Sequence, residues 1–246
     1  MKNKVYYILI IFILGFSKTT ANCQQINNIL SSDSSFQYAI NQYATSFHSH
    51  DILYNGSEYI DYNGIIVGTP FFSSDYYTVG NIEYNGLSYS NLFLLYDIVR
   101  DALVLLYNMP SGKSVQMELC KERTNSFTIN NHTFVYLPND TISKVPDKPG
   151  FYELLNNGDV KVFAKRQKIK REVIEPTKVY IEFDYHSDYY VYLKTNYFEV
   201  YSKRSVLNVL KDKKKEVRQF MHDSNINYRQ DREHAIVEMV KYYSNN

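Results

Sequence analysis

The chain has 246 residues, 44% of them hydrophobic, and a formal net charge of +1. A chain of this size can bury a full core without staples, and its two cysteines exclude a disulfide scaffold. Residues 22–150 carry 12 acidic and 6 basic side chains, whereas residues 151–246 carry 14 and 18. Neither part has the basic excess of a nucleic-acid-binding protein, so we expect no nucleic-acid partner.

The first residues predict export. Lys2 and Lys4 precede an apolar run over residues 5–16, and a small-x-small cleavage site ends at Ala21. The run has about twelve residues, whereas a membrane-spanning helix needs roughly twenty. We therefore expect a signal peptide over residues 1–21 and a mature protein in the periplasm, on the outer-membrane surface or outside the cell.

Cys23 follows this cleavage site closely. A cysteine there can accept a lipid, although the flanking Thr20-Ala21-Asn22 lacks the aliphatic residue and the small residue that such a site normally shows. In an oxidising compartment Cys23 could instead pair with Cys120, or both could remain thiols. These alternatives stay open, and lipidation at Cys23 is the one route to the membrane that the sequence suggests.

Along the mature chain, a helix comes first and strands follow. Apolar residues at helical spacing predict a short amphipathic helix within residues 33–47. In "GNIEYNGLSY" the pair Asn85-Gly86 predicts a two-residue type I′ hairpin turn, because both residues tolerate positive φ. A strand ending near Tyr96, polar turn residues 97–101 and a strand over residues 102–107 extend this hairpin to a three-strand meander.

Alternating or β-branched stretches predict the remaining strands. We expect them at residues 115–119, 126–129, 133–137, 151–155, 160–164, 178–185, 189–194 and 197–202. The motif "DYHSD", residues 184–188, is expected to form a polar turn between the strands that end at Tyr185 and begin at Tyr189.

The last forty residues change to a helical period. Apolar stripes predict two amphipathic helices, at residues 205–221 and 231–243. Helices kept apart from a sheet are the α+β pattern. We expect one α+β domain over residues 22–246, with a curved, half-barrel-like antiparallel meander and a subdivision near residues 140–150. The charged helical end argues against an outer-membrane barrel, which must close through its last strand.

Some clusters contain metal ligands. "HSHD" brings His48, His50 and Asp51 together, but a catalytic zinc site needs further ligands and no HExxH or paired CxxC is present. Asp97 and Asp101 could hold calcium, although hairpin-turn chemistry explains them more simply. We therefore expect no metal and no cofactor.

Catalysis has little support in the sequence. His186 stands between Asp184 and Asp188, an arrangement that could supply a hydrolase with a base and its orienting group. No GxSxG elbow, Walker loop or dinucleotide fingerprint completes a reaction. We expect no catalytic residue, and the hydrolase, using His186 or His48, ranks third among the functions considered.

Tyrosine is the most unusual component, with 25 tyrosines and no tryptophan. Three of them, Tyr54, Tyr62 and Tyr84, each precede an Asn-Gly pair. Their rings could form an aromatic rim for a ligand, or they could pack at strand ends, which tyrosine favours. The triplets lack the fixed period of a repeat array.

Two basic runs could meet a phosphate-rich surface such as lipid or lipopolysaccharide. They are "KVFAKRQKIKR", residues 161–171, and "KDKKKE", residues 211–216. The second run is more simply the solvated side of a helix. An envelope component, a glycan or a lipid is therefore the partner class that we consider.

Several stretches resemble a family of uncharacterised secreted proteins common in Bacteroidota. They are "LYNGSEYIDYNGIIVGTPFF", "GNIEYNGLSYSNLFLLYDIVRDALVL", "GFYELLNNGDVKVFAKRQK" and the lysine-rich helical tail. The resemblance runs from about Tyr54 to Tyr243 and implies bacterial origin and export, without an activity. We expect a non-catalytic binding module of the cell envelope. The main alternative is a periplasmic carrier that holds lipid or a lipoprotein in the half-barrel.

Overall fold

The computed structural model describes residue 53 and residues 56–109, 111–138 and 149–245. The chain divides into two compact units, residues 1–44 and 45–246, and all described residues belong to the second. The helix expected within residues 33–47, the signal peptide, Cys23 and the boundary region 140–148 lie outside the described residues.

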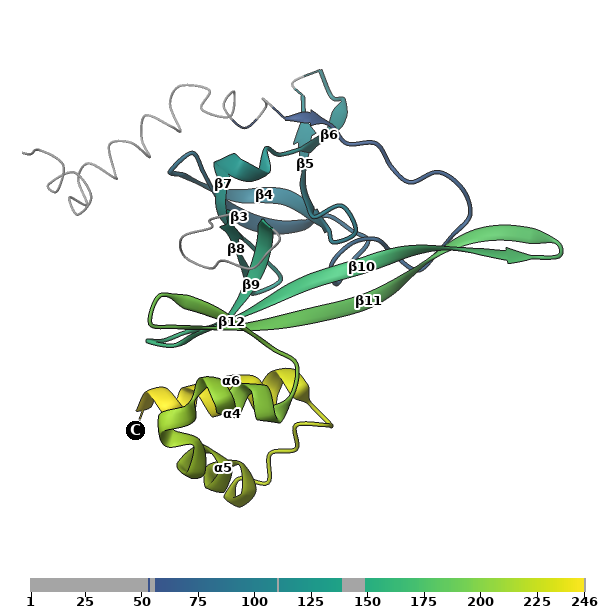
Figure 1. Ribbon diagram of the computed structural model, residues 1–246. Coiled ribbons are helices and arrows are strands. Elements are labelled where there is room, and N and C mark those ends of the chain that lie inside the picture. Colours follow the sequence, from purple (N-terminus) through teal and green to yellow (C-terminus); the bar gives the residue numbers. More distant parts are fainter. Residues whose placement is uncertain (1–52, 54–55, 110, 139–148, 246) are drawn as a thin grey trace, which may run out of the picture. The chain divides into compact units, whose positions relative to one another are not determined.

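The second unit is built on a mainly antiparallel sheet (Figure 1). Its strands take the order β1-β6-β5-β4-β3-β7-β8-β9-β10-β11-β12, and β2 adds to β11 in parallel. Their bounds are β1 (Ser57–Glu58), β2 (Ile66–Val67), β3 (Thr78–Tyr84), β4 (Leu87–Asp97), β5 (Ala102–Asn108), β6 (Ser114–Glu118), β7 (Thr124–Ile129), β8 (His132–Leu137), β9 (Gly150–Asn157), β10 (Lys161–Glu175), β11 (Lys178–Leu193) and β12 (Asn196–Val200).

The sheet is open and not strongly curled, so the half-barrel expectation was wrong. The two ends of the strand order, β1 and β12, are not paired with each other in the described part of the chain. Residues facing inward fill the space with side chains. The aromatic core includes Phe127 and Phe134, which stack with ring centroids 4.9 Å apart, and Tyr96 and Phe151 pack edge-on against them. Packed side chains thus occupy the space that a lumen would need.

The meander of β3, β4 and β5 is confirmed, and so is its first turn. Asn85 and Gly86 both have positive φ, 51° and 74°, as a type I′ turn requires. Asn157-Gly158 also joins two paired strands, β9 and β10, but neither residue has positive φ. The Asn-Gly pair thus marks chain reversals of more than one geometry.

Helices follow the sheet, as expected for an α+β chain, but the first one is divided. They are α4 (Lys203–Val209), the 3₁₀ turn η3 (Lys211–Lys213), α5 (Lys214–Asp223) and α6 (Arg232–Asn245). Leu210, with φ −91° and ψ 41°, leaves the helical region, so residues 205–221 do not form the single helix that was expected. The break lets Val206, Leu210 and Val217 all turn inward against β10, β11 and α6 in one apolar cluster. Within the described residues, no helix has both the length and the apolar character needed to cross a membrane.

A third correction concerns β10 and β11. The two strands pair without interruption from Lys161 with Tyr192 to Glu175 with Lys178, so residues 184–188 form the middle of a strand and no turn. Their charges are matched across the ladder. Arg171 contacts Asp184 at 3.2 Å, and Gln167 donates to Asp188 at 3.0 Å. Because these polar side chains have cross-strand partners, they stabilise the pairing of β10 with β11.

Candidate functional site

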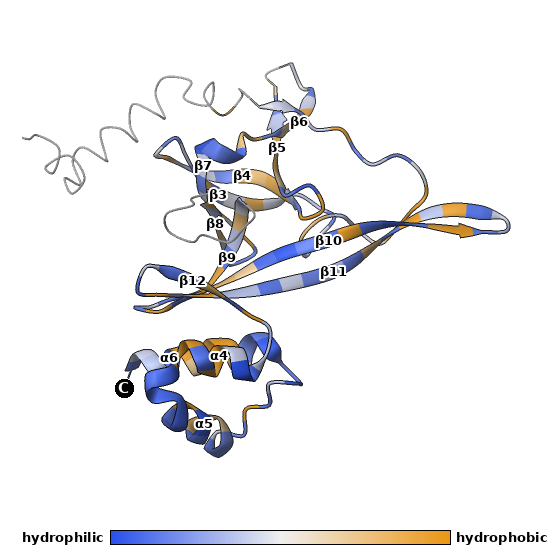
Figure 2. Ribbon diagram, viewed as in Figure 1, coloured by the Kyte–Doolittle hydropathy of each residue, from blue (hydrophilic) through white to orange (hydrophobic). Residues whose placement is uncertain are grey.

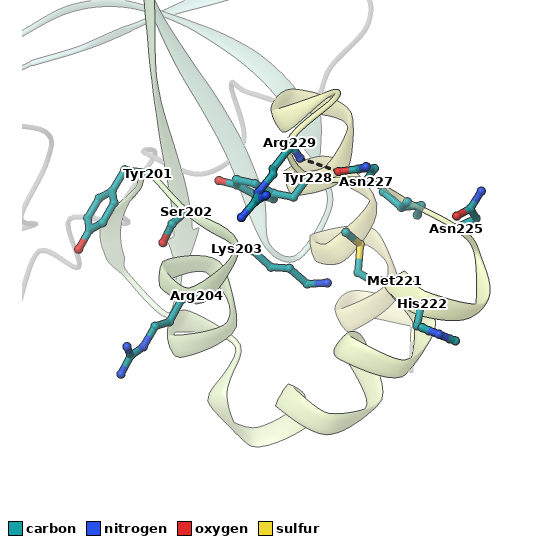
Figure 3. A pocket seen from close by; sticks show the side chains of 11 residues that line it. Tyr201, Ser202, Lys203, Arg204, Met221, His222, Asn225, Asn227, Tyr228 and Arg229 are labelled. Carbon is teal, nitrogen blue, oxygen red and sulfur yellow. Dashed lines mark hydrogen bonds between the residues drawn. The ribbon is translucent and has the colours of Figure 1, made fainter.

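A basic pocket lies between the start of α4 and the connection from α5 to α6 (Figure 3). Its volume is about 700 Å³. We call it the helix pocket; its lining is Tyr201, Ser202, Lys203, Arg204, Met221, His222, Asn225, Ile226, Asn227, Tyr228 and Arg229.

Local capping fixes both walls of the helix pocket. On the first wall Ser202 and Ser205 form a capping box: Ser205 N–H donates to Ser202 Oγ at 3.1 Å, and Ser202 N–H donates to Ser205 Oγ at 3.0 Å. On the second wall Arg229 N–H donates to Asn227 Oδ1 at 3.0 Å, and Asp231 caps α6 through His234 N–H at 2.9 Å. The long basic side chains therefore project from defined backbone.

The lining carries positive charge without compensation. Lys203, Arg204 and Arg229 contribute cations, and no aspartate or glutamate belongs to the lining. Among the described residues, none of these three cations forms an ion pair. In Figure 3 the Lys203 side chain extends toward Met221 and the Arg229 side chain lies beside Tyr228, whereas Arg204 points away at the rim. Such a site attracts an anionic group, and ammonium and guanidinium groups are good phosphate partners.

The helix pocket lacks the parts of a catalytic centre. Ser202 Oγ is engaged in the cap of α4, and His222, whose ring is exposed, contacts only Asp223 among the described carboxylates. A nucleophile within reach of a base, which acyl or phosphoryl transfer needs, is not assembled by the pocket residues.

Two of the tyrosines expected to bind a ligand, Tyr62 and Tyr84, have different surroundings. Tyr84 is fully buried in the aromatic core. Tyr62 donates to Asp97 Oδ2 at 2.8 Å, and its ring packs edge-on against Phe183 with centroids 5.6 Å apart. Tyr54 lies outside the described residues, as do His48, His50 and Asp51. Tyr62 and Tyr84 thus stabilise the fold in different places.

The carboxylates considered for calcium have other partners. Asp97 accepts hydrogen bonds from Tyr59, Tyr62 and two backbone N–H groups. Asp101 accepts from Tyr96 at 2.6 Å and contacts Lys165 at 2.9 Å. No group of three or more metal-ligating side chains occurs in the described part of the chain.

The residues considered for hydrolysis lie on a strand face. His186 Nε2 contacts Asp188 Oδ1 at 2.7 Å, two residues along β11, and the imidazole is exposed. His186 does not belong to the lining of the helix pocket. Cys120, which was considered for a disulfide with Cys23, is a thiol that donates to Glu122 Oε2 at 3.3 Å. Its possible partner Cys23 lies outside the described residues.

The basic runs contribute to structure more than to the helix pocket. In the first run Lys165 and Arg166 are buried and bound to acidic partners. The second run forms η3 and the start of α5, outside the pocket lining. Sequence reasoning missed Lys203 and Arg229 because they stand well apart in the chain, and only the fold of α4, α5 and α6 brings them together.

Comparison with protein-family models, with curated proteins and with solved structures found no match for this chain.

Proposed function

We propose that the protein is an exported, non-catalytic binding module of the cell envelope, and that its helix pocket holds a phosphate group carried by an envelope component. The observation behind the proposal is the set of cations in the pocket lining without a carboxylate among them. Lys203 is partly buried and Arg204 and Arg229 are exposed, and an anion bound among these cations would offset their mutual repulsion. Export and envelope location rest on the predicted signal peptide.

The two alternative functions have less support. A lipid carrier needs an enclosed apolar cavity, whereas the aromatic core around Phe127 and Phe134 is filled by stacked rings. A hydrolase needs a base, an orienting carboxylate and a nucleophile in one cleft, and the exposed pair His186 and Asp188 has no such cleft among the described pockets.

The proposal is tested with vesicles of phosphatidylglycerol, with phosphatidylcholine vesicles as the neutral reference. Replacing Lys203 and Arg229 by glutamate should weaken binding to anionic vesicles by roughly tenfold or more, since each cation near such a surface contributes about 1 kcal/mol. Co-sedimentation at fixed ionic strength measures the change.

A matched control makes the same charge change elsewhere on the helices. Lys215 and Arg218 lie on α5 outside the helix pocket, and their double replacement by glutamate should weaken binding much less. Equal losses in the two double variants would mean that overall charge, and not the pocket, attracts the anion. A titration with inorganic pyrophosphate followed by NMR should shift the amides of Lys203 and Arg229 first, which separates phosphate recognition from attraction to a membrane surface.

A further inference from the structure

The outer part of the β10–β11 hairpin leaves the rest of the sheet. β9 pairs with β10 only over residues 161–164, and β12 pairs with β11 only over residues 189–193. Beyond these points the hairpin continues as two strands, and among the described strands only β2 pairs with it, at Ile181 and Glu182 (Figure 1). We call residues 169–182 the distal ribbon.

The distal ribbon exposes large apolar side chains. Ile174 is 77% exposed, Ile169 is 63% exposed and Val179 is 46% exposed. Figure 2 shows apolar positions on both strands near the end of the ribbon. A two-stranded ribbon is marginal in water, and the facing pair Ile174 and Val179 near its end exposes apolar surface that a partner could cover.

Beyond Lys168 the outer edge of β10 has no strand partner among the described residues. Lys168 N–H points away from β11 and donates to Ile98 O at 3.0 Å. Because backbone direction alternates along a strand, the N–H and C=O groups of Lys170, Glu172 and Ile174 also point outward. In the described part of the chain these groups have no backbone partner. Such an edge is a template for another strand.

We propose that the partner is a second copy of this chain, paired antiparallel along this edge with Val173 on the twofold axis. A symmetric edge pairing sets the residue on the axis against its own copy. With Glu172 on the axis two carboxylates would face each other. With Arg171 there two guanidinium groups would meet, and the partner's Ile174 would need the space that Ile98 occupies beside Lys168. Val173 avoids both conflicts.

This register makes the charges alternate across the joined strands. On one face the order becomes Glu182, Arg171, the partner's Glu175 and the partner's Lys178, and the same row is repeated on the other side of the axis. Each chain already supplies half of every row, because Arg171 contacts Glu182 at 2.8 Å and Lys178 contacts Glu175 at 3.4 Å. Opposite charges facing each other across strands stabilise a sheet.

The same register also covers apolar surface. The middle row becomes Tyr180, Val173, the partner's Val173 and the partner's Tyr180, which is a favourable aromatic and β-branched set. On the opposite face Ile174 comes beside the partner's Glu172, and the row continues to the partner's Ile181. Glu172 and the partner's Ile174 exchange both of their backbone hydrogen bonds. The ribbon therefore carries both halves of a self-complementary interface.

Cysteine cross-linking tests the register. At a pair without mutual hydrogen bonds, facing Cα atoms lie about 4.5 Å apart, within the range of a disulfide. In a chain with Cys23→Ser and Cys120→Ser, the variant Val173→Cys should form a disulfide-linked dimer under mild oxidation. The control Ile174→Cys should not, because its two cysteines would be offset by two residues on each strand, roughly 8 Å apart.

Sedimentation velocity tests the association itself. The wild-type chain should dimerise reversibly with rising concentration. Val173→Lys should raise the dissociation constant about tenfold by facing two ammonium groups, whereas Val173→Thr should change it less than about twofold. A wild-type chain that stays monomeric, or cross-linking of Ile174→Cys as fast as Val173→Cys, would overturn the proposal. Neither result depends on the helix pocket.

Discussion

A single carboxylate, Asp97, organises one region of the fold. It is fully buried at the end of β4, where Oδ2 accepts from Tyr59 at 2.9 Å and from Tyr62 at 2.8 Å. Oδ1 accepts from the N–H groups of Val99 at 2.8 Å and Arg100 at 3.0 Å. Burial, together with the Asp97 charge, raises the pKa of both tyrosine hydroxyls, so they remain donors far into alkaline solution. The carboxylate thus ties the segment before β2 to the β4–β5 turn.

We expect Asp97→Ala to lower the free energy of unfolding by about 3 kcal/mol or more. The substitution leaves two hydroxyls and two N–H groups without their acceptor in a buried place. Asp159→Ala, in the exposed β9–β10 connection, should change stability by less than about 0.5 kcal/mol. Urea denaturation followed by far-UV circular dichroism measures both, and equal losses would contradict the role given to Asp97.

At the scale of elements, local pattern predicted the meander well and the long ribbon poorly. Residues 78–84 alternate in burial, residues 102–107 form a continuous apolar run, and the chain turns at residues with the right chemistry, so pattern and fold agree. Residues 184–188 look like a turn, but Arg171 and Gln167 on the neighbouring strand provide polar partners for them, and that pairing is not visible in local sequence. The helix pocket is a similar case. Its cations come to line one pocket only because the helical segment breaks at Leu210 and the chain changes direction before α5.

The Asn-Gly pairs at residues 85–86 and 157–158 offer a direct test of local geometry. Gly86 has φ +74°, and a Cβ added there would meet only open space, so Gly86→Ala should cost about 1–2 kcal/mol through backbone strain alone. Gly158 lacks positive φ, and an added Cβ would come no closer than 3.4 Å to Asn156. Gly158→Ala should therefore be neutral within about 0.5 kcal/mol. Thermal unfolding of the two variants compares them, and a larger loss at Gly158 would refute the distinction.

At the scale of the whole described unit, one buried arginine joins the sheet to the helices. Arg166 on β10 donates through Nε to Glu153 on β9 at 2.6 Å, and its Nη1 contacts Glu233 on α6 at 2.7 Å. Glu153 also contacts His132 on β8, and Glu233 accepts from Tyr189 on β11 at 3.0 Å. Burial and the neighbouring Glu233 raise the pKa of Tyr189 to about 12, so this hydroxyl remains a donor across the neutral range. These contacts link β8, β9, β10 and β11 to α6. The apolar clusters alone would fix the position of α6 less specifically.

Removing Glu233, the α6 residue in this series of contacts, should therefore loosen the helices from the sheet. Glu233→Ala leaves Tyr189 without its acceptor and Arg166 with one carboxylate in place of two, which should cost about 1.5–3 kcal/mol. Glu238→Ala is the matched control on the same helix, because among the described residues Glu238 forms an ion pair with the exposed Lys241 alone, and its loss should cost at most about 0.5 kcal/mol. Hydrogen exchange adds a spatial readout: amides of α6 should exchange faster in Glu233→Ala while those of β3 and β4 keep their protection. If protection fell equally in the sheet and in the helices, Arg166 would stabilise the fold in general and would not specifically link the sheet to α6.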